Sequence, residues 1–161
     1  GRLPWMASKY GFTFDPFKLT GVKVPASRRA AALEAVGNYL LESALVEIGA
    51  GRAPVAGGPW KRSLTKEYKE RKAEESSVTF ANAELSVELL DELDVKEVRG
   101  GKIFYGVEGD QAGKAEGNNI GSYGREPDEG KARRIIPLEG ETFKPAIVQG
   151  MREVLEGFVD E

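Results

Sequence analysis

The chain has 161 residues, a net charge of -3 and an apolar fraction of 40%, values typical of one ordinary globular domain. It contains no cysteine and no histidine, which excludes disulfides, thiolate nucleophiles, cysteine-based zinc sites and a histidine general base. We therefore expect a non-enzymatic protein without a metal or cofactor. The slight acidic balance argues against a free-standing nucleic-acid binder. We also expect no membrane association, because no apolar run approaches bilayer length and no signal-peptide pattern is evident.

Residues 1–24 form an aromatic segment that we separate from a single domain over residues 25–161. Tyr10, Phe12 and Phe14 alternate with small residues, and this period of two predicts a strand. The rings have two interpretations. They pack within their own chain, which we favour, or they dock as an arm on a neighbouring subunit.

A long helix is predicted to begin at Pro25 and Ser27, with Ser27 as its N-cap. Gly49 and Gly51 are expected to end it. One apolar stripe runs along it, made of Leu33, Val36, Leu40, Ala44 and Ile48.

Residues 51–60 have the composition of a loop, and a short basic helix follows over residues 61–72. Its lysines and arginines alternate with glutamates. A solvated helix face with charge pairs one turn apart explains this pattern better than a phosphate-contacting patch does.

Another helix is predicted from an Asn82 cap through Leu85 and Leu89 to Leu93. We interpret the acidic residues at its end, Asp91, Glu92 and Asp94, as ordinary solvated side chains rather than as a metal cluster.

A hairpin follows, with Gly100 and Gly101 as its turn. A two-residue loop would place Val98 opposite Ile103 and leave one apolar face, which must pack on a helix.

Residues 109–124 are polar and rich in glycine, and we interpret them as a long loop that serves assembly. Arg133 and Arg134 follow in an extended segment, where side chains alternate, so at least one should reach outward. Arginine suits interfaces with carboxylates, although a structural role is equally compatible with the pattern. The predicted assembly interface comprises Trp60, Lys114, Gly117, Asn118, Asn119, Tyr123, Arg133 and Arg134.

The last helix is predicted to start between Thr142 and Pro145. Its apolar face carries Ile147, Met151, Val154 and Phe158. Together the elements predict an α+β fold in which the long N-terminal helix and the C-terminal helix pack on a small antiparallel sheet.

Several short motifs, taken in order, resemble those of phage virion-morphogenesis proteins, the neck or tail-completion proteins of tailed bacteriophages. The likeness covers residues 27–158, and Ile135 stands where the family signature Arg-Arg-Phe-Ile-Pro has an aromatic residue. The motifs are residues 51–58 followed by Leu64, Tyr68 and Lys72, then residues 102–107, 114–119, 133–137 and 139–143.

The resemblance implies a structural subunit of the ring that joins tail to head around the DNA channel. Six copies are expected, together with other neck proteins and a tail terminator. DNA would pass through the lumen without sequence-specific binding, and the protein would reside in the virion after assembly in the host cytoplasm. The resemblance does not distinguish tail completion from head completion or termination.

Two other functions remain open from the residues alone. One is a nucleic-acid-binding module that uses residues 61–72 and the two arginines. The other is a histidine-free hydrolase with paired carboxylates such as Glu139 and Glu141, which ranks last.

Overall fold

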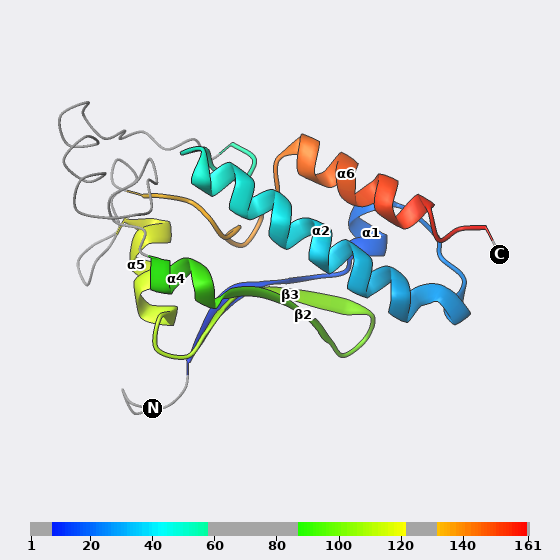
Figure 1. Ribbon diagram of the computed structural model, residues 1–161, viewed down its shortest axis with the longest axis horizontal. Helices are drawn as coiled ribbons and strands as arrows, with labels where there is room; N and C mark the ends of the chain where they lie inside the picture. Colours follow the sequence, from blue (N-terminus) through cyan, green and yellow to red (C-terminus); the bar gives the residue numbers. More distant parts are fainter. Residues whose placement is uncertain (1–7, 58–86, 122–131, 161) are drawn as a thin grey trace.

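A computed structural model describes residues 8–57, 87–121 and 132–160. It confirms the α+β fold, with a three-stranded antiparallel sheet in the order β1-β3-β2. In Figure 1 the long helix α2 crosses the sheet, α6 lies on the far side of α2, and α4 and α5 lie at one end. Our predictions for residues 61–72 and for Asn82, Trp60 and Tyr123 lie outside the described residues.

The first described strand, β1 (Lys9–Phe14), pairs with the central strand β3 (Lys102–Glu108). The strand predicted from the aromatic alternation is confirmed, and Phe12 and Phe14 pack against the core beside Phe143. The short helix α1 (Pro16–Thr20) follows, capped by the Asp15 carboxylate. These elements, which belong to the segment that we separated at residue 24, share one core with the rest of the described chain.

The hairpin joins β2 (Leu93–Val98) to β3, and Gly100 and Gly101 both have positive φ angles, 82° and 73°. The predicted register is wrong by one residue, because Val98 pairs with Lys102 and Glu97 with Ile103. The connection therefore holds three residues, with Arg99 in the loop.

Helix α2 (Arg29–Gly49) covers the sheet, and the five residues of its predicted apolar stripe are all buried. Its N-cap is Arg28 rather than Ser27, because a 3-10 turn over Ala26–Arg28 precedes the helix. Gly37 lets α2 approach β2 closely, since a Cβ there would lie 3.2 Å from Val95 Cγ1.

Helix α6 (Pro145–Glu156) packs on α2 and begins at Pro145 as predicted. Ile147, Met151 and Leu155 are its buried residues. Val154 is only partly buried, so the centre of the apolar face lies one position from where we placed it.

Helix α4 (Val87–Glu92) ends before Leu93, which is the first residue of β2 and not part of a helix as predicted. On the sheet face away from α2, the Phe104 ring lies over Gly11 and Gly106. A Cβ at Gly11 would lie 2.5 Å from that ring, and Phe104 is only 5% exposed. Two glycines therefore let one aromatic ring cover this part of the sheet.

The stretch that we predicted as a long loop contains helix α5 (Ala112–Ile120), which ends at Gly121 with a φ of 73°. That part of the prediction is wrong, and residues 122–131 lie outside the description. In the described parts of the chain, no helix is both long and apolar enough to cross a membrane.

Candidate functional site

The structure separates the eight residues of the predicted assembly interface into three groups. Trp60 and Tyr123 lie outside the described residues. Lys114 is exposed on α5. The other five, which are Gly117, Asn118, Asn119, Arg133 and Arg134, are buried within the chain.

Asn119 is the centre of this buried group and is fully shielded from solvent. Its Oδ1 accepts hydrogen bonds from the backbone N–H groups of Ile135 and Ile136 at 2.7 and 2.9 Å. Its Nδ2 donates to the Ile136 carbonyl at 2.8 Å and to the Tyr10 hydroxyl at 3.0 Å. One amide side chain thus satisfies polar groups of β1 and of the segment after residue 131.

Arg134 lies within the same segment and joins it to the end of α5. Its Nε lies 3.1 Å from Glu141 Oε1, and its Nη1 donates to the Asn119 carbonyl. Glu141 Oε1 also accepts from the Leu138 N–H at 2.8 Å. We call Tyr10, Asn119, Arg134 and Glu141, with the backbone they bind, the Asn119 clamp.

The expectation that at least one arginine of the pair reaches outward is wrong, since Arg133 and Arg134 are 5% and 8% exposed. The backbone N–H of Arg133 donates to the Asn118 carbonyl at 2.6 Å. Carbonyl acceptors at the end of α5 therefore draw the Arg134 guanidinium and the Arg133 backbone inward.

Tyr105 extends the clamp into the core, because its hydroxyl donates to the Ile135 carbonyl at 2.7 Å. The ring meets Phe143 edge to face, with centroids 5.0 Å apart. Complete burial raises the pKa of the Tyr105 hydroxyl. Burial also raises the pKa of Tyr10, opposed by its hydrogen bond from Asn119. Both phenols are therefore neutral hydrogen-bonding groups at physiological pH.

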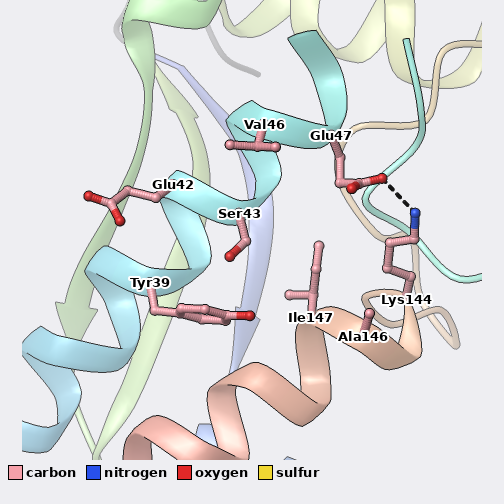
Figure 2. Close-up of a pocket in the computed structure, with 8 residues that line it drawn as sticks. All are labelled: Tyr39, Glu42, Ser43, Val46, Glu47, Lys144, Ala146 and Ile147. Carbon is pink, nitrogen blue, oxygen red and sulfur yellow. Dashed lines mark hydrogen bonds and ion pairs between the residues drawn. The ribbon is translucent and has the colours of Figure 1, made fainter. Parts of the chain in front are cut away.

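A second candidate site is the α2/α6 groove, an open hollow of about 370 Å³ between these helices. Figure 2 shows Glu47 of α2 and Lys144 pointing toward each other at one end, and Tyr39 at the other. Val46 lines the groove and is 64% exposed. The groove was not predicted, because it depends on how two helices far apart in the sequence pack on each other.

Glu47 is the most strongly perturbed carboxylate among the described residues. It accepts hydrogen bonds from Arg52 Nε at 3.0 Å and from Lys144 Nζ at 2.6 Å, and these bonds lower its pKa to about 2. Two cations around one carboxylate tie the end of α2 to the start of α6. This arrangement joins structural elements, and its carboxylate is ionised and paired rather than poised for proton transfer.

Across residues 8–57, 87–121 and 132–160, no group of three or more carboxylates is placed to hold a metal ion. Asp91 and Glu92 lie on α4, whereas Asp94 lies on β2. The Asn119 clamp and the ion pairs of Glu47 join segments of the fold. No protein-family model matches the chain, and no curated protein or solved structure matches it significantly.

Proposed function

We propose that the chain is a structural, non-catalytic subunit of a phage head–tail connector, acting in tail completion. In this proposal about six copies form a ring with other neck proteins and a tail terminator, and the ring joins tail to head in the virion. DNA crosses the lumen without sequence-specific contacts, for which a net charge of -3 is suited because it disfavours adhesion to phosphates.

One observation carries the proposal: motifs that resemble the family in sequence bind one another in the fold. Tyr105, from the motif over residues 102–107, donates to Ile135 of the twin-arginine motif. Asn119, from the motif over residues 114–119, binds the backbone of Ile135 and Ile136. Arg134 pairs with Glu141 of the motif over residues 139–143.

These contacts explain why the motifs occur together, because each motif binds a residue of another. Their polar atoms are paired with one another and position three distant segments, so they are used within the fold rather than presented to a substrate. Signature residues that are used to hold the fold together support the proposal of a structural protein, whose function depends on its shape. The 61–72 segment of the nucleic-acid alternative lies outside the described residues, and no described contact favours that alternative.

The decisive experiment is to purify phage particles from cells that express a tagged copy of the chain. Mass spectrometry should detect the chain in particles, and electron microscopy with a label on the tag should place it at the neck. A tagged copy of a non-structural phage protein is the control for carry-over. If the chain is absent from intact particles, the proposal is wrong.

A second experiment tests the role of the clamp in assembly. Arg134→Met should reduce the amount of chain that enters particles, because it removes the ion pair with Glu141 and releases the 132–143 segment. Lys114→Ala changes an exposed residue of the same motif region and tests whether surface contacts on α5 contribute. Normal incorporation of the Arg134→Met variant, at equal expression, would contradict a clamp-dependent assembly surface.

A further inference from the structure

Strand β2 forms one edge of the sheet. The hydrogen bonds between β3 and its two neighbours determine which backbone N–H and C=O groups of β2 point away from the sheet. At the end of the β1–β3 pair, the Gly109 N–H donates to the Ser8 carbonyl at 2.7 Å. Backbone groups alternate in direction along a strand. Odd-numbered residues of β3 therefore face β1, and even-numbered residues face β2.

The even-numbered residues of β3 pair with even-numbered residues of β2, such as Phe104 with Lys96. The N–H and C=O groups of Leu93, Val95 and Glu97 therefore point away from the sheet. Leu93 is only 3% exposed where α4 ends, so Val95 and Glu97 form the accessible part of this edge. Within the described residues, the one hydrogen bond found on this outward side of β2 comes from the strand itself: the Asp94 carboxylate accepts from the neighbouring Val95 N–H at 2.8 Å. An edge of this kind is a template for an added strand.

A hollow of about 210 Å³ lies beside this edge, between β2 and α2. Gly37 and Asn38 line it from α2, and Val95 lines it from β2. The close approach at Gly37 brings the helix over the strand, so an added strand would insert its side chains below α2. We call this hollow and the adjoining edge the β2 slot.

The charges of the β2 slot define the chemistry of its occupant. Glu34 of α2 and Glu97 of β2 line it. Lys96 also lines it, but its ammonium is paired with the Glu108 carboxylate at 2.6 Å. An extended segment with Lys or Arg at alternate positions would place its cations on one face, toward the two glutamates.

We propose that the β2 slot binds an extended basic segment of a partner protein by adding it as a fourth strand. A second copy of this chain is the less suitable occupant. Its β2 strand carries Glu97 itself, and its Lys96 is already paired with Glu108, so it does not offer the free cations that would complement Glu34 and Glu97. The proposal is independent of the connector function, because it concerns only this edge.

The probe is the hexapeptide Lys-Val-Lys-Val-Lys-Val, acetylated and amidated, titrated into the ¹⁵N-labelled full chain. Amide shifts should concentrate at Val95 and Glu97 and at Gly37. Two N-methylated peptides, methylated at the lysine or at the valine nitrogens, distinguish strand addition from loose charge attraction. One of the two should lose about tenfold in affinity, because its edge can no longer donate to β2, while the other binds as before.

Three variants complete the test. Glu34→Lys combined with Glu97→Lys should weaken binding about tenfold, whereas Glu42→Lys, the same change elsewhere on α2, should not. Asp94→Ala should bind about fivefold more tightly, since the Val95 N–H no longer has a local acceptor. The proposal is overturned if millimolar peptide shifts no amide of β2, if both methylated peptides bind equally, or if Glu42→Lys weakens binding as much as the double variant. A concentration-dependent dimer with protected β2 amides in the protein alone would identify a second copy as the occupant and would also overturn it.

Discussion

Asn119→Ala tests the central claim about the clamp. The substitution deletes two acceptor sites and two donors at a fully buried position. The N–H groups of Ile135 and Ile136 would lose their partner inside the protein, at about 1–3 kcal/mol for each unsatisfied group. We therefore expect a loss of about 4 kcal/mol, a large share of the roughly 5–15 kcal/mol that stabilises a typical domain.

Urea denaturation followed by far-ultraviolet circular dichroism measures this loss as a change in the free energy of unfolding. Tyr10→Phe removes only the hydroxyl that meets Asn119 Nδ2 at 3.0 Å, and it should cost about 1 kcal/mol. Asn38→Ala, at an exposed position on α2, should change stability by less than about 0.5 kcal/mol. If Asn119→Ala costs no more than Asn38→Ala, the clamp does not hold the fold and the reasoning is refuted.

Three further predictions use the same denaturation assay. Arg134→Met should cost about 3 kcal/mol by leaving the partly buried Glu141 carboxylate without its cation and the Asn119 carbonyl without this donor, and a cost below about 1 kcal/mol would contradict the assigned ion pair. Gly106→Ala should cost at least about 3 kcal/mol, because its Cβ would lie 2.4 Å from a β1 carbonyl oxygen. Gly113→Ala, which meets nothing within 4 Å, should be neutral or stabilise α5 by up to about 1 kcal/mol, and equal effects of the two glycine substitutions would show that the β1–β3 approach is not close. The pKa of Glu47 is lowered from 4.5 to about 2, so its ion pairs stabilise the fold above pH 4.5 and lose this effect as pH falls toward 2. Glu47→Gln should therefore reduce the fall in the free energy of unfolding between pH 4.5 and pH 2, whereas Glu42→Gln should not. An equal fall in the two variants would contradict the prediction.

Local periodicity was enough to predict α2, α6 and the strands, because these elements bury one regular face. The apolar stripe of α2 and the start of α6 at Pro145 follow from spacing and capping rules. The hairpin was predicted with its register wrong by one residue. Both Gly100 and Gly101 adopt positive φ angles, and the sequence does not reveal that Arg99 joins them in the loop.

The clamp could not be predicted, because its residues are polar and lie far apart along the chain. Asn119 belongs to a glycine-rich stretch whose low helix propensity indicated a loop, yet α5 forms there. Contacts with Tyr10 and with the 132–143 segment supply the stability that local propensity lacks. The buried state of Arg134 depends likewise on the Asn119 carbonyl and on Glu141, which no local pattern brings near.

The strand order also has a consequence for the path of folding during synthesis. Lys9 pairs with Glu108, so β1 leaves the ribosome long before its partner exists. Until β3 emerges, the aromatic residues of β1 have no sheet to join, and closing so large a loop slows the search. The nascent chain thus carries exposed aromatic surface while the residues between Phe14 and Lys102 are synthesised, which makes early chaperone engagement advantageous for yield.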